Sequence, residues 1–303
     1  MNNLLVLVRR EYWENRSLWI APLVIAGLIL FAAVTGGIHA GDDGSFIFNP
    51  DEGPSDVELA QIAGGLDKQR AGYGVFLAAL TGFQLLVLGI VVFFYLLDSL
   101  LGERKDRSIL FWKSLPISDT QVVASKTLTA LVATPLYVLL VSAVTQLVFG
   151  VIWAVRSSGN PVLEMLIPFD AGVWLQVQAG SFLLAFATIV WYLPLAGYLL
   201  LVSVWARKNA FLWAVLPPVA LMIGEAILMR THHLADFLGR RFSGVYEIMA
   251  VNQSQAMEAN SALGLFAQRV GVALVHWETW AGIAVAVVLF AAVVRIRRYR
   301  DDS

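Results

Sequence analysis

Six stretches of the chain are long, apolar and almost free of charge. They are residues 18–36, 76–97, 127–151, 180–204, 210–229 and 277–295. An ionisable side chain is costly in hydrocarbon, and a helix needs about 20 mostly apolar residues to cross a bilayer. The pattern therefore predicts six transmembrane helices. The fourth stretch contains Pro194 and could be two short segments, but its charge-free window, residues 171–206, is too short for two full crossings.

The segments between these stretches are more polar and predict connections of different kinds. Residues 37–74 are rich in Gly, Asp and Glu, which indicates an irregular loop. Residues 152–178 form a shorter loop. Residues 230–276 contain two runs, 245–249 and 263–274, with apolar residues at helical spacing. We therefore expect short external helices just before the last transmembrane helix.

Residues 1–16 interleave apolar and charged side chains ahead of the first apolar stretch. Arg9, Arg10 and Glu11 follow several leucines, and Tyr12 and Trp13 come next. This pattern predicts an amphipathic helix on the membrane surface, with its aromatic rings at headgroup depth. A plain cytoplasmic extension of the first span is the alternative. We do not expect a cleaved signal peptide, because the apolar stretch is as long as a span and no convincing small-residue cleavage site follows.

The composition supports a membrane protein and excludes several other classes. Of the 303 residues, 58% are hydrophobic and 14% are charged, against about 45–50% and about 25% in soluble domains. A soluble globular domain and a disordered chain are therefore both excluded. The net charge of −1 argues against a nucleic-acid binder. Because the chain has no cysteine, it has no disulfides, thiolate metal site or thiol nucleophile. We treat residues 1–303 as one all-α polytopic transmembrane domain.

The positions of Lys and Arg predict the orientation in the membrane. About two thirds of the 21 Lys and Arg residues fall on the side that holds the N-terminus, in the shorter connecting segments. Cytoplasmic loops carry an excess of Lys and Arg. We therefore expect both termini to lie in the cytoplasm, and the protein to be a multi-pass protein of the cell's inner (plasma) membrane.

Motifs of membrane enzymes are missing from the sequence. The chain has no His-Glu-x-x-His, no Gly-x-Ser-x-Gly and no Gly-x-x-x-x-Gly-Lys-Ser/Thr phosphate loop. His232 and His233 are adjacent, so on a helix they would point to different faces, which is poor geometry for a shared metal. The sequence therefore predicts neither an enzyme nor a metal site.

Residues 98–125 join the second and third spans on the predicted cytoplasmic side. Charged residues open this segment, an apolar and aromatic run follows, and a proline ends it. This order predicts a short helix whose apolar face must be buried in lipid headgroups or in a partner protein. A surface helix without a partner is the alternative. The candidate residues are Glu103, Arg104, Arg107, Ile109, Phe111, Trp112, Lys113, Leu115 and Pro116.

The order of these elements resembles the permease subunits of ATP-binding-cassette exporters of the type-2 (ABC-2) family. The matching motifs are the basic and aromatic segment 9–13, Gly-Glu-Arg at 102–104, Ser-Leu-Pro-Ile-Ser at 114–118, and Lys126 at the start of the third span. In topology the resemblance covers the whole chain. In sequence motifs it covers residues 98–126 and 9–16.

The resemblance implies a transmembrane subunit of an ATP-driven export complex. Segment 103–116 would dock into a separate ATPase subunit, with Phe111 and Trp112 as apolar anchors and Arg104, Arg107 and Lys113 as polar rim contacts. Two permease chains, either copies or paralogues, would assemble with two ATPase subunits. ATP and magnesium would bind the ATPase subunits, and this chain would carry no cofactor.

The pathway between two such permeases would be lined by their second and fifth spans, as the resemblance implies. Candidate polar groups there are Thr81, Gln84 and Glu225. Glu225 also lies close enough to Arg230 to reach the external interface instead. Two other functions remain open: a secondary transporter that uses Glu225 as its proton site, and an assembly protein that docks a partner through 103–116. The sequence does not identify the cargo.

Overall fold

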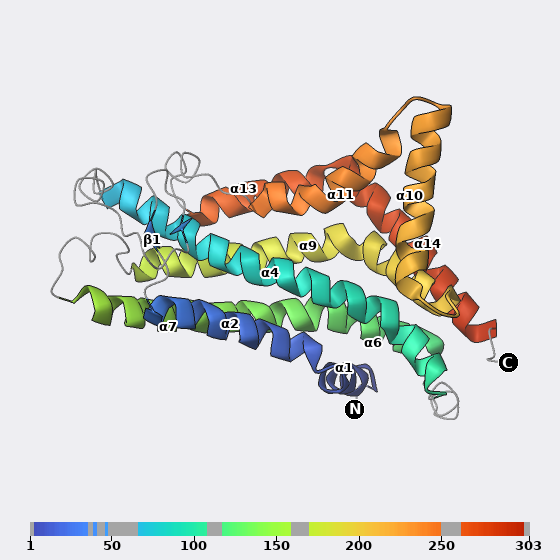
Figure 1. Cartoon of the computed structure of the whole chain (residues 1–303), viewed down its shortest axis with the longest axis horizontal. Helices are drawn as coiled ribbons and strands as arrows, with labels where there is room; N and C mark the ends of the chain where they lie inside the picture. The colour runs from blue at the N-terminus through green and yellow to red at the C-terminus, as the bar shows by residue number, and fades with distance from the viewer. Residues whose placement is uncertain are drawn as a thin grey trace.

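The structure is a computed structural model, and it describes residues 3–35, 39–40, 46–47, 66–107, 117–158, 170–249 and 262–299. Nearly all of these residues are helical (Figure 1). The helices are α1 (Asn3–Glu14), α2 (Ser17–Thr35), α4 (Leu66–Lys105), α6 (Asp119–Leu128), the π-helical turn η1 (Thr129–Ala133), α7 (Thr134–Ser157), α9 (Ala171–Trp205), α10 (Ala210–Leu228), α11 (His233–Met249), α13 (Ala262–Val275) and α14 (Trp277–Tyr299). Two short strands, β1 (His39–Ala40) and β2 (Phe46–Ile47), pair antiparallel within the segment predicted to be an irregular loop.

Six helical segments in the described part of the chain are long and apolar enough to cross a membrane, which confirms the predicted six spans. They are Ser17–Thr35, Gly72–Lys105, Asp119–Arg156, Ala171–Trp205, Ala210–Leu228 and Trp277–Tyr299. The fourth is one continuous helix through Pro194, so the alternative of two short segments is wrong. The second, third and fourth spans are longer than the apolar stretches, because polar residues can continue a helix beyond the hydrocarbon.

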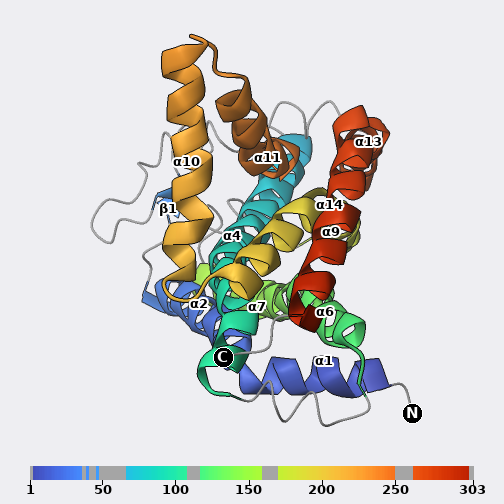
Figure 2. The same cartoon turned by 90° about the vertical axis from the view of Figure 1, so that its right-hand side faces the viewer.

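Helix α9 is the central helix of the bundle. It packs against α4, α7, α10, α11, α13 and α14. Its inner face carries Leu199 and Leu200, which join Leu96 and Leu100 of α4 in the largest buried apolar cluster. Both chain termini lie at the same end of the bundle, beside α6 (Figures 1 and 2).

Helix α10 stands apart from the other spans. It leaves the bundle at a wide angle to the other spans (Figure 1). Only 6% of its span is buried, against 44% for α9. Large apolar side chains such as Leu216, Leu221 and Ile227 are exposed along it. In a membrane, lipid or another protein chain must cover this surface.

Helices α11 and α13 occupy the segment before the last span, and α13 closely matches the predicted run 263–274. Helix α11 is fixed to the bundle by Arg241. Its guanidinium lies over the Trp191 ring at 4.4 Å and donates to the carbonyl oxygens of Trp191 (3.3 Å) and Glu278 (2.6 Å). A glycine at position 282 leaves room for that guanidinium, since a Cβ there would collide with it. Arg241 thus joins α11 to both α9 and α14.

Candidate functional site

Five charged residues meet at the end of the bundle where both termini lie, and we call them the ion cluster. They are Glu11, Glu103, Asp119, Lys126 and Arg297. Helices α1, α4 and α14 supply one residue each, and α6 supplies two. The cluster therefore connects α4 and α6 with α1 and α14, which lie near opposite ends of the chain.

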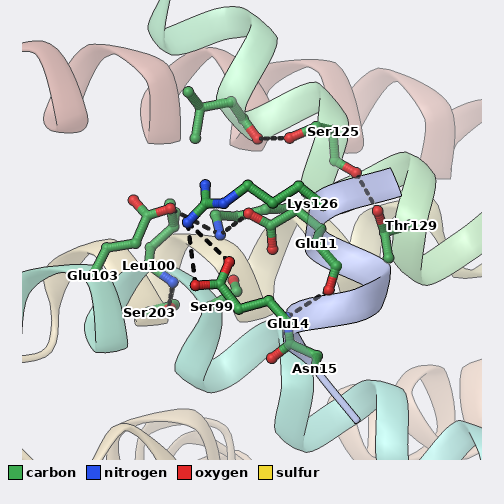
Figure 3. A network of polar contacts seen from close by, with 12 residues as sticks. Glu11, Glu14, Asn15, Ser99, Leu100, Glu103, Ser125, Lys126, Thr129 and Ser203 are labelled. Atoms are coloured by element: carbon green, nitrogen blue, oxygen red, sulfur yellow. Dashed lines mark hydrogen bonds and ion pairs between the residues drawn. The ribbon is translucent and has the colours of Figure 1, made fainter. Parts of the chain in front are cut away.

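Lys126 is the centre of one half of the cluster. Its Nζ atom lies 2.8 Å from Glu11 Oε1 and 2.9 Å from Glu103 Oε1 (Figure 3). The other oxygen of Glu11 accepts a hydrogen bond from the Tyr95 hydroxyl at 3.0 Å. Lys126 and Glu11 are 2% and 5% exposed. Glu11 therefore points from α1 into the bundle, where Lys126 neutralises its charge.

Arg297 is the centre of the other half. Its Nη1 donates to Glu103 Oε2 at 2.7 Å, and its Nε donates to Asp119 Oδ1 at 3.0 Å. The side chain of Arg297 is 2% exposed. Glu103 precedes residues 108–116 and Asp119 follows them, so a single guanidinium holds both sides of that segment.

Local structure places Asp119 and Lys126 for these contacts. Ser118 caps α6 by a capping box with Gln121, in which each side chain accepts a hydrogen bond from the other residue's backbone N–H. This cap sets the direction of α6 from its first residue.

The π-helical turn η1 follows α6 and precedes Pro135, which lacks a backbone N–H. The Thr134 hydroxyl donates a hydrogen bond to the Thr129 carbonyl oxygen at 2.6 Å. Such turns accommodate a proline inside a long span.

The charges of the cluster do not cancel. Three carboxylates face two cations, which gives a formal charge of −1, and each cation is shared between two carboxylates. Removing one partner from a buried pair leaves an uncompensated charge and costs about 3–5 kcal/mol. Loss of either cation is therefore expected to destabilise the packing of the three helices that it joins, α1, α4 and α6 for Lys126 and α4, α6 and α14 for Arg297.

The structure describes three of the predicted coupling residues. Glu103 belongs to the ion cluster. Arg104 donates to the carbonyl oxygens of Ser203 (2.7 Å) and Ala206, at the C-terminal end of α9. Cations are favoured there, because the last carbonyl groups of a helix carry partial negative charge. The side chains of Glu103 and Arg104 therefore both make their polar contacts within the bundle.

Arg107 is exposed and has a positive φ of 55° just beyond the end of α4. The chain turns at this residue. Ile109, Phe111, Trp112, Lys113, Leu115 and Pro116 lie outside the described residues.

The segment predicted to lie on the membrane surface forms helix α1, and the two faces of this helix differ. Glu11 and Leu7 are buried, whereas Arg9 and Trp13 are exposed. Arg10 forms an ion pair with Glu14 at 2.9 Å along the same helix. The exposed face therefore combines a tryptophan with a cation.

Tyr12 turns towards the first turns of α7, where its ring meets Tyr137 edge to face, with centroids 5.7 Å apart. Burial, together with the neighbouring Tyr137, raises the pKa of Tyr12 above its usual value. Tyr12 therefore stays neutral and acts as a packing residue.

The three candidate pathway residues have different surroundings. Thr81 and Gln84 are 3% and 1% exposed on the face of α4 that packs inside the bundle. Glu225 accepts hydrogen bonds from the Thr231 hydroxyl (2.8 Å) and from the backbone N–H groups of His233 (2.8 Å) and Leu234 (2.9 Å). Its carboxylate thus caps the first turn of α11, an arrangement that stabilises a helix N-terminus.

Sequence reasoning missed Asp119, Arg297 and Tyr95 as members of the site. One signal was available: each charged member lies at or near the end of an apolar stretch. Arg297 lies two residues beyond the last stretch, among four arginines between residues 295 and 300. Nothing in the sequence distinguishes the one that turns inward.

Among the residues that the structure places, no three His, Asp or Glu side chains gather in a way that could hold a metal ion. Comparison with protein-family models, with curated proteins and with solved structures found no match to this chain.

Proposed function

We propose that this chain is the transmembrane subunit of an ATP-driven export complex, working with a separate ATPase subunit of the ATP-binding-cassette type. The observation that carries the proposal is the attachment of Arg297 to both Glu103 and Asp119. These residues flank segment 108–116, which contains the aromatic motif. A force applied to that segment would reach α4 and α6 at once, and α14 through Arg297.

The ion cluster also supplies a route from that segment to α1. Lys126 lies about two turns beyond Asp119 on α6 and pairs with Glu11 of α1. Buried ion pairs hold a defined geometry, because separating them leaves bare charges. A movement imposed by closure of the ATPase would therefore displace the four helix ends together, shifting access from one membrane face to the other.

The remaining parts of the proposal follow from the same assignment. Both termini lie in the cytoplasm of a cell whose inner (plasma) membrane holds the protein, and α1 lies along the membrane surface with Trp13 in the headgroup layer. Two permease chains and two ATPase subunits form the complex, and ATP with magnesium binds the ATPase subunits. The exposed apolar surface of α10 is available to the second permease chain.

Affinity purification from the source membranes tests the proposal. We expect the tagged full-length chain to co-purify with a chain that carries a phosphate-loop motif, and the pair to hydrolyse ATP. Changing both Phe111→Ala and Trp112→Ala is expected to abolish both binding and stimulated hydrolysis. Trp280→Ala is the matched control, because it removes an exposed indole (65% exposed) from another region.

Three results would contradict the proposal. Intact ATPase binding and stimulated hydrolysis in the Phe111 and Trp112 variant would show that this segment is not the coupling element. Transport driven by a proton gradient in vesicles holding this chain alone would favour a secondary transporter. Stoichiometric capture of a partner without a phosphate loop would instead indicate an assembly protein.

A further inference from the structure

A second group of polar side chains lies in the interior of the bundle, away from the ion cluster. It consists of Thr81 and Gln84 of α4, Ser142 and Gln146 of α7, and Gln178 of α9, and we call it the polar cluster. All five side chains are at most 8% exposed, and none is ionisable. All five residues belong to candidate membrane spans, where the bundle has no water around it.

Four members form a continuous chain of hydrogen bonds. Thr81 Oγ1 lies 2.9 Å from Ser142 Oγ, and Gln146 Nε2 donates to Thr81 Oγ1 at 2.8 Å. Gln146 Nε2 also lies 3.2 Å from Ser142 Oγ and 3.0 Å from the carbonyl oxygen of Leu77. Gln178 Nε2 donates to Gln146 Oε1 at 2.7 Å. Side-chain hydrogen bonds of this kind join helices within a membrane.

Gln84 is the exception within the polar cluster. It lies one turn from Thr81 on the buried face of α4 that also carries Leu77 and Leu88, and it is 1% exposed. Neither its amide nitrogen nor its amide oxygen has a hydrogen-bond partner among the described residues, and the same holds for Gln178 Oε1. One donor group and two acceptors are thus buried without a partner. Buried polar groups of this kind are rare, because dehydration is not repaid.

We propose that the polar cluster is a water-binding site, in which ordered water accepts from Gln84 Nε2 and donates to the free amide oxygens of Gln84 and Gln178. Water offers two donors and two acceptors, and buried water typically has two to four polar partners. The site has one donor group and two acceptors without partners, so a molecule that can both accept and donate hydrogen bonds matches it.

The chemistry of the cluster favours water over an ion. No charged side chain belongs to it, so an anion has no counter-charge. A cation would need several oxygen atoms that point to one place. Here the oxygen atoms of Leu77, Thr81 and Ser142 already surround the amide nitrogen of Gln146. A water molecule at Gln84 would also let α4 change its hydrogen-bond partners on α7 and α9 while every polar atom keeps a partner. The proposal does not depend on an ATPase partner.

X-ray hydroxyl-radical footprinting of the full-length protein in lipid nanodiscs tests the site, because bound water yields radicals that oxidise neighbouring side chains. Leu77 and Val177 border the polar cluster, whereas Leu96 and Leu199 lie in the largest buried apolar cluster; all four are at most 2% exposed. We expect oxidation of Leu77 and Val177 to be several-fold faster than that of Leu96 and Leu199. In Gln84→Leu this excess should fall to the control level.

Equal oxidation of the four positions in the wild-type protein would overturn the proposal, and this comparison needs no variant. Unchanged excess oxidation in a folded Gln84→Leu protein would also overturn it, since the water would not depend on Gln84. Gln84→Met, which keeps the length of the side chain, replaces the leucine variant if that protein does not purify as a single species.

Discussion

Replacing Arg297 with methionine separates Glu103 from Asp119 while keeping a long side chain in the same space. Arg297 is 2% exposed and holds the two carboxylates at 2.7 and 3.0 Å. After the change Lys126 alone faces Glu11 and Glu103, and the formal charge of the cluster falls from −1 to −2. We expect this variant to be strongly destabilised at the end of the bundle where the termini lie.

The size of the effect follows from burial. Breaking a buried ion pair by removing one partner costs about 3–5 kcal/mol. Glu103 keeps its pair with Lys126, and the side chain of Asp119 is 26% exposed and thus partly hydrated. These two features place Arg297→Met near the lower limit, at about 3 kcal/mol. Glu103→Gln should cost less, about 1–2 kcal/mol, because each remaining cation keeps a carboxylate.

The assay is thermal unfolding of the purified protein, followed by intrinsic fluorescence. The chain has ten tryptophans and no cysteine, which excludes dyes that report on buried thiols. Arg298→Met is the matched control, because this residue is the next one on α14 and is exposed. A surface substitution of this kind usually changes stability by less than about 0.5 kcal/mol.

The double variant Arg297→Met with Glu103→Gln gives the sharpest test. Removal of the Glu103 charge relieves the excess of carboxylates left by the loss of Arg297, so the two effects should not add. We expect the double variant to be at least as stable as Arg297→Met alone. Additive losses, or an Arg297→Met protein as stable as Arg298→Met, would refute the cluster as a cooperative unit.

Three further predictions concern other contacts. Gly282→Ala should displace the Arg241 guanidinium and lower stability by about 1–2 kcal/mol, less any gain in helix propensity, as thermal unfolding will show. Glu225→Gln should speed hydrogen exchange of the His233 amide by weakening the cap of α11, yet preserve ATP-driven transport; loss of transport would instead indicate a proton site. Thr81→Val removes a hydrogen-bonding hydroxyl between α4 and α7 and should cost about 1 kcal/mol in thermal unfolding, whereas no change would show that this contact contributes nothing.

Most of the fold was predictable, because the bilayer imposes a length and a composition on each span. Stretches 18–36 and 210–229 match α2 and α10 to within one residue at each end. The ends of α4 and α9 were less predictable. Helical residues there continue into polar sequence, where hydropathy no longer distinguishes a helix from a loop.

The sites were predictable in their residue types but not in their partners. Glu103 was singled out in the charged opening of segment 98–125, and Glu11 among the interleaved apolar and charged residues 1–16. Their pairing with Lys126 and Arg297 depends on how four helices rotate about their own axes. Arg297 is 178 and 194 residues from its two carboxylates, and no local pattern encodes contacts at that separation. Gln84 was proposed to line a pathway because it is polar, but the rotation of α4 turns it inward.

The use of an arginine at position 297 argues for positioning rather than for stability alone. A buried ion cluster is often no more stable than well-packed apolar side chains in the same place. The fork of a guanidinium, however, can bind two carboxylates in fixed directions, whereas an ammonium is a compact point charge. Here Nε and Nη1 serve carboxylates on opposite sides of segment 108–116. This geometry fixes the separation between Glu103, which precedes the segment, and Asp119, which follows it.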